Sequence, residues 1–184
     1  CAEYIVSEGG CAGYDLIDEA LRRVPPHQMA GGVYPKAYEM MSFFEGLAEY
    51  HLATGEPRPR EAVLALFESL LEHEITVTGS GGGDAPYYEH GECWDNTALE
   101  QANPRLDRTM ETCVTVTWLK FCIQVFRLTG DPRAIDALER TVYNALLGAA
   151  RPDGKKFSYM NRLNGVKSDP EGWGVWVAGA GTFT

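Results

Sequence analysis

The sequence predicts a mainly α-helical fold, an arc of an (α/α)6 barrel with a long glycine-rich loop and short β segments at its C-terminal end. Two stretches of similar pattern, residues 36–75 and 111–150, each carry a pair of amphipathic segments joined at Thr-Gly. Repeated helical hairpins that bury both faces form toroids or solenoids. Because two or three hairpins cannot close a six-hairpin ring, we expect residues 1–184 to be one domain, incomplete at both ends. Residues 155–166 and 172–184 are expected to form strands and turns.

Five helices are expected from the apolar pattern and its end signals. Two of them end at a Thr-Gly pair, at Gly55 and Gly130, because glycine accepts the left-handed conformation that commonly follows a helix. Asp131 is expected as the N-cap of the last helix, with Pro132 in the first helical position, where its missing N–H costs little. The expected helices span residues 14–24, 34–56, 59–75, 110–131 and 131–150.

A glycine-rich segment, residues 76–108, separates the two hairpins. Loops of this length are uncommon in compact proteins and are usually functional or disordered. With Tyr87, Tyr88 and Trp94, the segment is too aromatic for a plain linker, and aromatic faces beside carboxylates suit sugar binding and proton transfer. The alternative is a solvated acidic loop. The carboxylates of this segment are Asp84, Glu89, Glu92, Asp95, Glu100 and Asp107.

Composition and charge exclude several classes of function. The chain has 16 basic and 26 acidic residues and a formal net charge of -10, whereas nucleic-acid binding needs a basic face. No apolar run is long enough to span a membrane, and the opening residues CAEYIVSEGG lack the features of a signal peptide. The five cysteines follow no disulfide-framework spacing, so reduced thiols and a cytoplasmic setting are expected. The sequence carries no signal for oligomeric state.

Glu111 and Cys113 stand at the start of the third long helix, which is otherwise apolar. Side chains two residues apart leave a helix in different directions. At the N-terminal end, however, both can bend toward one point, where the helix dipole favours a carboxylate and a thiolate. The pair is therefore a candidate metal site. The alternative is a capping acid followed by a small core thiol.

The four histidines show none of the spacings of known metal motifs. His27, after a Pro-Pro pair, and His90, in the glycine-rich segment, are candidates for contact with a ligand, as is Trp94. His51 and His73 fall within helical pattern and are expected at the surface or in packing contacts.

Several blocks of the sequence, in their order and spacing, resemble glycoside hydrolase family 127, the β-L-arabinofuranosidase type, and its close relatives. The similarity begins near PPHQMAGGVYPKAYEMM and runs to the C-terminus. Its most specific parts are TVTGSGGG followed by GECW, then METC, then LERTVYNALLGA with DGKKFSYMNRL. The resemblance implies part of a catalytic (α/α)6 barrel whose partner is a carbohydrate substrate.

The resemblance also implies a retaining mechanism. In the family, a cysteine thiolate attacks the anomeric carbon and forms a thioglycosyl intermediate that water resolves. Zinc, bound by one glutamate and three cysteines with the nucleophile among them, keeps that sulfur deprotonated. A separate glutamate protonates the leaving oxygen and later deprotonates water.

Carried over position by position, Glu111 and Cys113 match the Glu-x-Cys zinc ligands of the family. Glu92, in Gly-Glu-Cys-Trp, matches the acid/base glutamate. Because the spacing from Glu92 to Glu111 is longer than in the family, Glu89 and Glu100 are its rivals.

Tyr159 matches a tyrosine that lies near the nucleophile in the family. The remaining two zinc ligands of the family are an adjacent Cys-Cys pair, which this sequence lacks. Either Trp176 and Val177 occupy those positions, or the pair follows Thr184; we expect the second. With two ligands where zinc needs at least three, this polypeptide alone should be inactive. The alternative function is an inactive α/α toroid that binds carbohydrate or holds structural zinc.

Overall fold

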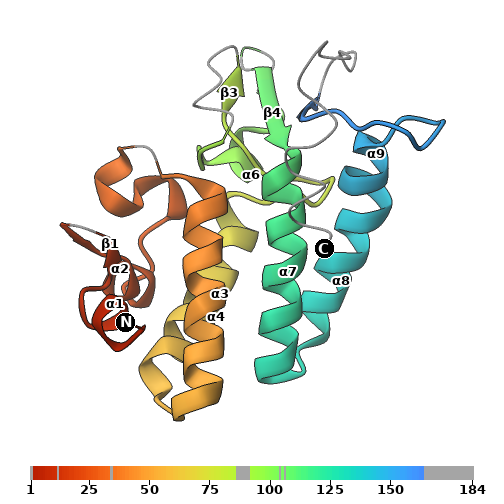
Figure 1. Ribbon diagram of the computed structural model, residues 1–184. Helices are drawn as coiled ribbons and strands as arrows, with labels where there is room; N and C mark the ends of the chain where they lie inside the picture. The colour runs from red at the N-terminus through yellow and green to blue at the C-terminus, as the bar shows by residue number, and fades with distance from the viewer. Residues whose placement is uncertain are drawn as a thin grey trace.

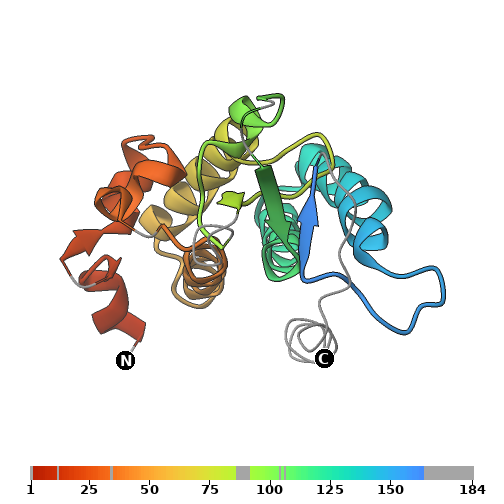
Figure 2. The same cartoon turned by 90° about the horizontal axis from the view of Figure 1, so that it is seen from above.

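The computed structural model describes residues 2–11, 13–33, 35–85, 92–103, 105 and 107–163, and within them the fold is mainly helical, as predicted. The long helices run side by side (Figure 1). Seen from above, they follow a curved row (Figure 2). None of the described helices is long and apolar enough to cross a membrane. The chain opens with α1 (Ala2–Ser7), β1 (Gly10–Cys11), β2 (Tyr14–Asp15), α2 (Leu16–Leu21) and the 3-10 segment η1 (Pro26–Gly32).

The first hairpin consists of α3 (Ala37–Thr54) and α4 (Pro57–His73). α3 ends at Gly55, whose φ of 77° is left-handed, as the Thr-Gly signal predicts. α4 begins with Pro57 in its first turn, where no helical hydrogen bond is lost. Both predicted helices are confirmed, with boundaries shifted by less than one turn.

The second hairpin is less regular than predicted. Asp131 is confirmed as an N-cap, since its side chain accepts from the N–H of Arg133 at 2.9 Å. The single helix expected after it contains a π-helical turn, however. This turn begins where the Thr141 hydroxyl donates to the carbonyl of Gly79 at 2.7 Å, a contact from a distant segment. The hairpin comprises α7 (Thr112–Thr129), α8 (Pro132–Arg140), the π-helix η2 (Thr141–Leu146) and α9 (Leu147–Ala149).

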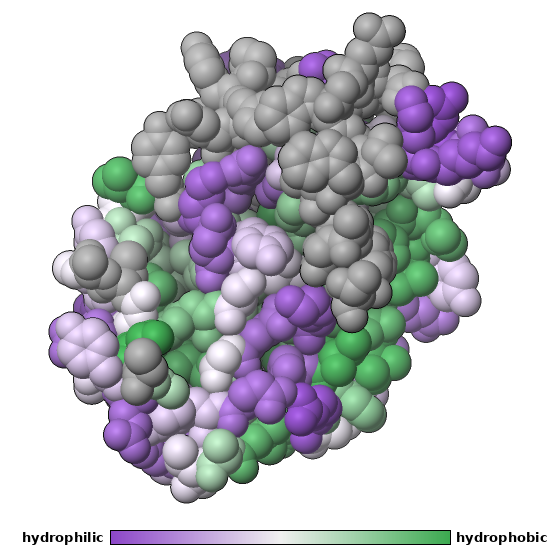
Figure 3. Space-filling model, viewed as in Figure 1, coloured by the Kyte–Doolittle hydropathy of each residue, from purple (hydrophilic) through white to green (hydrophobic). Residues whose placement is uncertain are grey.

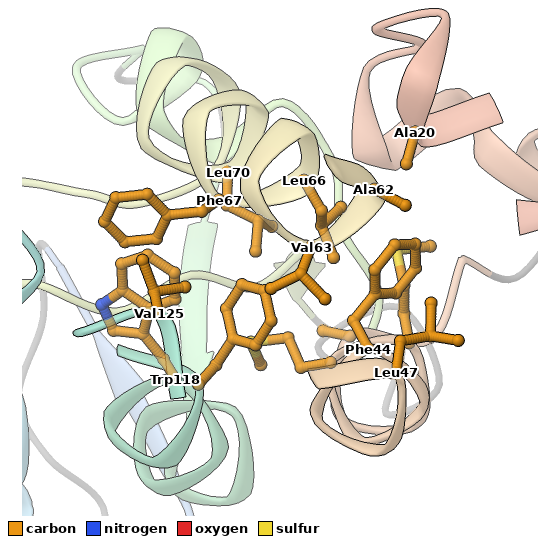
Figure 4. Close-up of a cluster of buried hydrophobic side chains, with 14 of the residues drawn as sticks. Ala20, Phe44, Leu47, Ala62, Val63, Leu66, Phe67, Leu70, Trp118 and Val125 are labelled. Atoms are coloured by element: carbon orange, nitrogen blue, oxygen red, sulfur yellow. The ribbon is translucent and has the colours of Figure 1, made fainter. Parts of the chain in front are cut away.

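The hydrophobic core lies where α3, α4 and α7 meet, and it joins the two hairpins (Figure 4). Phe44 from α3 and Phe67 from α4 are buried. Trp118 from α7 stacks on Phe67, with ring centroids 5.6 Å apart and 15° between the ring planes. Burying each large apolar side chain contributes about 1.5–3 kcal/mol. This core therefore fixes α7, including its first turn, relative to the first hairpin.

The glycine-rich segment has more regular structure than predicted. Its described residues include β3 (Asp84–Ala85), α6 (Thr97–Glu100) and the start of β4 (Asp107–Glu111). β4 pairs antiparallel with β3 on one side and with β5 (Met160–Arg162) on the other. The sheet stands at the end of the helices where α7 begins, and β4 leads directly into α7 (Figure 1).

Two smaller predictions have different outcomes. β5 confirms a strand within residues 155–166, whereas residues 172–184 lie outside the described part of the chain. The helix predicted over residues 14–24 is present as the shorter α2, whose N-cap is Asp15.

Hydrophobic side chains remain exposed along α8, η2 and α9. They gather on the right-hand side of the face shown in Figure 3. Ile135, Tyr143 and Leu147 are among the exposed large hydrophobic residues. The described part of the chain thus leaves this side of the second hairpin uncovered.

Candidate active site

The predicted pair Glu111 and Cys113 lies at the junction of β4 and α7, beside β5. Glu111 ends β4 and occupies the N-cap position of α7, and Cys113 lies in the first turn. The N–H of Thr112 donates to the carbonyl of Tyr159 at 2.8 Å, and its hydroxyl donates to the carbonyl of Ser158 at 2.6 Å. These two bonds hold Tyr159 against the same end of α7.

The Tyr159 hydroxyl joins the two predicted ligands. It donates to Oε1 of Glu111, and Sγ of Cys113 donates to the same hydroxyl oxygen at 3.7 Å. Glu111 is only 3% exposed, and its side chain makes no capping hydrogen bond to α7. Glu111 thus occupies the N-cap position without capping the helix through its side chain. A carboxylate and a thiol converge on one phenol.

Burial dominates the protonation of these three groups. It raises the pKa of Glu111 to about 7, although the hydrogen bond from Tyr159 lowers it in part. Burial, together with the charge of Glu111, raises the pKa of Cys113 to about 12. Burial, with the hydrogen bond to Glu111, also raises the pKa of Tyr159. Loss of solvent thus disfavours the ionised forms, and a cation at this point would lower all three pKa values.

Glu92 forms an ion pair with Lys36 within electrostatic reach of this cluster. Backbone hydrogen bonds of 3.0 Å pair residues 92–94 with residues 35–37 in antiparallel fashion. Lys36 Nζ donates to the Glu92 carboxylate, and this bond raises the pKa of the lysine. The charge of Glu92 also raises the pKa of both predicted metal ligands, so its carboxylate lies within electrostatic reach of them.

The rivals of Glu92 are placed differently. Glu100 ends α6, where its carboxylate accepts from the Asn103 side chain at 3.0 Å. Within the described part of the chain, Glu100 shows no interaction with Glu111 or its neighbours. Glu89 and His90 lie outside the described residues, so their roles stay predictions.

The other predicted ligand-contact residues, His27 and Trp94, line a cavity beside Cys93. The structure adds two residues that the sequence did not single out, Lys36 and Glu74. Glu74 is fully buried, and its Oε1 lies 2.8 Å from Nδ1 of His27. The one signal that could have marked them is the sign of their charge, because Lys36 stands at the N-terminal end of α3 and Glu74 at the C-terminal end of α4, where the helix dipole disfavours these charges.

Thiolate and carboxylate are both ligands that zinc accepts, and Glu111 and Cys113 could hold it. They supply two of the at least three protein ligands that a zinc site needs. The described ranges contain no group of three or more His, Cys, Asp or Glu side chains suited to a metal ion. The residues present therefore fit one half of the zinc site that the resemblance implies.

The chain matches the family described as β-L-arabinofuranosidase, GH127 catalytic domain, over residues 20–177. No curated protein matches it. Among solved structures it is similar to a GH127 β-L-arabinofuranosidase from Geobacillus stearothermophilus T6, with 24% identity and a TM-score of 0.60 over 70% of this chain and 19% of that one. A GH127 β-arabinofuranosidase has 25% identity and a TM-score of 0.61, covering 81% of this chain and 24% of that chain.

A further structure, a glycoside hydrolase, has 20% identity and a TM-score of 0.60 over 80% of this chain and 25% of its own. The chain therefore spans 19–25% of the length of these three proteins. The helical fold and the family match agree with the resemblance found in the sequence segments around Glu92, Glu111 and Tyr159. The chain belongs to the GH127 β-L-arabinofuranosidase catalytic-domain family.

Proposed function

We propose that the protein carrying this chain is a retaining glycoside hydrolase that releases a terminal sugar of the β-L-arabinofuranosyl type. The observation that carries the proposal is the convergence of Glu111, Cys113 and Tyr159, with the carboxylate of Glu92 within electrostatic reach of them. Family membership and the likeness to a protein named as a β-arabinofuranosidase support the class of sugar.

Glu111 and Cys113 are proposed as two ligands of a zinc ion. When bound, zinc would keep coordinated thiols ionised, which buried thiols otherwise resist. The two further cysteine ligands implied by the family are not in this sequence. Tyr159 donates to one oxygen of Glu111, so it would orient that carboxylate, as hydrogen-bond partners of metal ligands commonly do.

Glu92 is proposed as the general acid and base. In the first half of a double displacement it would give a proton to the departing glycosidic oxygen, and in the second it would take one from water. The ion pair with Lys36 holds the carboxylate in place. The ammonium group would also balance the charge of the carboxylate after it gives up its proton.

The test compares two substrates with the intact protein. Glu92→Gln should lower kcat/KM at least about 100-fold for an arabinofuranosyl disaccharide, because general acid catalysis contributes about 10²–10⁴-fold when the leaving oxygen needs a proton. The loss should be much smaller for 4-nitrophenyl β-L-arabinofuranoside, whose leaving group departs as a stable anion. Glu100→Gln is the matched control and should keep wild-type kinetics. A Glu92→Gln variant with wild-type turnover of the disaccharide would remove Glu92 from this role.

A catalytically inactive protein that binds carbohydrate or holds structural zinc is the second candidate. The finding in its favour is that the described residues contribute only two converging metal donors. It predicts that the intact wild-type protein binds the disaccharide or zinc without releasing arabinose. Release of arabinose by the wild type, and its loss in Glu92→Gln, would exclude this candidate.

A further inference from the structure

The side chain of Glu74, at the C-terminal end of α4, is fully buried. Its two oxygen atoms bond to segments that are distant from each other in the sequence. Oε1 accepts from the backbone N–H of His27 at 3.2 Å and lies 2.8 Å from Nδ1 of that histidine. Oε2 accepts from the backbone N–H groups of Asp95 and Thr97, each at 3.2 Å. A carboxyl group is costly to bury unless hydrogen bonds replace its water, and these bonds do so.

The backbone between the two N–H groups on Oε2 has a conformation that few residues adopt. Asn96 has φ of 55° and ψ of 36°, in the left-handed region, although it is not a glycine. With this turn at Asn96, the N–H groups on either side of it point to one oxygen atom of Glu74. Backbone N–H groups that converge on one point favour an anion there. Glu74 therefore anchors this turn of the backbone.

The turn belongs to residues 92–97, which we call the acid/base segment because it begins with Glu92. Near its start, the N–H of Trp94 donates to the carbonyl of Pro35 at 3.0 Å. Near its end, the backbone bonds to Glu74. The acid/base segment is thus held at two points by parts of the chain that are far away in the sequence.

Hydrogen bonds also join the acid/base segment to the strand that ends in a predicted zinc ligand. The Thr97 hydroxyl donates to the carbonyl of Gly82. The next carbonyl, that of Gly83, accepts from the N–H of Thr109 in β4 at 3.1 Å. β4 ends at Glu111. The glycine-rich run therefore lies between the acid/base segment and β4, and a shift of the segment would alter the distance from Glu92 to Glu111.

We infer that Glu74 is a positioning residue, which anchors the acid/base segment and so holds Glu92 where it can protonate the leaving oxygen. The inference rests on the proposed function, in which Glu92 is the general acid. Glu74 acts through the backbone of the segment. A general acid must lie within hydrogen-bond reach of the oxygen that it protonates. A displacement of about 1 Å can lower the rate about 100-fold.

The experiment uses the intact protein and the two substrates that test Glu92. Glu74→Met has a side chain of similar length, but it has no oxygen atom to accept from Asp95 and Thr97. The ratio of kcat/KM for the disaccharide to that for 4-nitrophenyl β-L-arabinofuranoside should fall at least about tenfold, because only the disaccharide needs protonation of its leaving oxygen. A loss of folded protein lowers both values equally and leaves the ratio unchanged, so a purely structural role of Glu74 would not move it.

Glu74→Gln is the conservative variant, and it decides the matter if Glu74→Met does not fold. Its single carbonyl oxygen replaces two acceptors, so it can satisfy only part of the N–H groups that Glu74 binds. The ratio should fall about threefold, less than in Glu74→Met, because one acceptor remains. In either variant that folds, a ratio within twofold of the wild type would overturn the inference.

Two controls separate positioning from stability. Val125→Ala removes part of a buried side chain near the far end of α7, so it should lower the unfolding midpoint without touching the acid/base segment. Glu45→Gln makes the same chemical change as Glu74→Gln in a carboxyl group that pairs with Lys120. Both controls should keep the wild-type ratio. A fall in either control equal to that in the Glu74 variants would overturn the inference.

Failure of the proposed function is recognised separately. If the wild type hydrolyses neither substrate, the proposed function fails, and hydrogen exchange still tests the anchor. In Glu74→Met, the amides of Asp95 and Thr97 should exchange at least about tenfold faster than in the wild type, relative to the amides of α7, because they lose their acceptor. Global unfolding speeds all amides alike, so it does not change this relative rate. An unchanged relative rate at these two amides would overturn the inference.

Discussion

Replacing Tyr159 with phenylalanine removes one oxygen atom from the centre of the proposed site. That oxygen donates to Glu111, which is 3% exposed, and accepts from Cys113. Leaving a buried acceptor without its donor costs about 1–3 kcal/mol. Loss of a hydrogen-bond partner of a metal ligand typically weakens metal affinity about 10–100-fold. Because tenfold corresponds to about 1.4 kcal/mol, the two estimates agree.

The assay is a competitive zinc titration against a chromophoric chelator, with the intact protein at one fixed pH. We expect Tyr159→Phe to weaken zinc binding about 10–100-fold. The phenyl ring still fills the space of a residue that is 6% exposed, so the packing around it should persist. The free energy of unfolding of the zinc-free protein, measured with denaturant, should fall by about 1–3 kcal/mol, because the Glu111 carboxylate loses its hydrogen-bond donor.

Tyr143→Phe is the control, because Tyr143 is 67% exposed and lies in η2, away from β4 and β5. It should change neither zinc affinity nor the free energy of unfolding. If Tyr159→Phe binds zinc as tightly as the wild type, the hydroxyl of Tyr159 does not orient a metal ligand.

Three further substitutions test other parts of the structure. Lys36→Met should lower kcat/KM for the disaccharide about tenfold or more, because the Glu92 carboxylate is no longer held in place. The free energy of unfolding should change by less than about 1 kcal/mol, as for other partly exposed ion pairs. Burial raises the pKa of Glu45 while Lys120 partly offsets this, so ionisation opposes folding as pH rises. Glu45→Gln should therefore raise the Tm at pH about 7. The gain should vanish near pH about 3, where the carboxyl group is protonated in both states; an equal gain at both pH values would contradict this. Gly79→Ala should lower the free energy of unfolding by about 1–3 kcal/mol. The φ angle of Gly79 is 89°, and a Cβ there would lie 2.8 Å from backbone atoms of η2. An unchanged unfolding midpoint would be evidence against this contact.

The helices could be predicted because their signals are local. The glycines at positions 55 and 130 adopt left-handed φ, and Asp131 caps the next helix with its own side chain. Each of these features depends on residues within one turn of the chain. The same holds for the start of α7 just after Glu111, which places the two predicted metal ligands at the end of a helix.

The arrangement of the glycine-rich segment could not be predicted, because distant residues determine it. The backbone N–H groups of Asp95 and Thr97 bond to Glu74, on the preceding helical hairpin. The partner of Glu92 is Lys36, which is brought there by an antiparallel contact between two loops. The periodic pattern of apolar residues does not identify such pairs, because their two partners lie far apart in the sequence. The roles of Glu92, Glu111 and the residues around them in catalysis and zinc binding stay predictions.

We propose that Glu111 and Cys113 are ligands of a zinc ion in the intact protein. Atomic emission measures zinc per polypeptide after dialysis against buffer that contains no added metal. We predict about one zinc per chain in the wild type and a large loss in Cys113→Ala, because zinc sites need at least three protein ligands. Cys122→Ala, which removes a buried thiol from the same helix, should keep its zinc. A wild-type protein without stoichiometric zinc, or a Cys113→Ala variant that retains it, would contradict the claim.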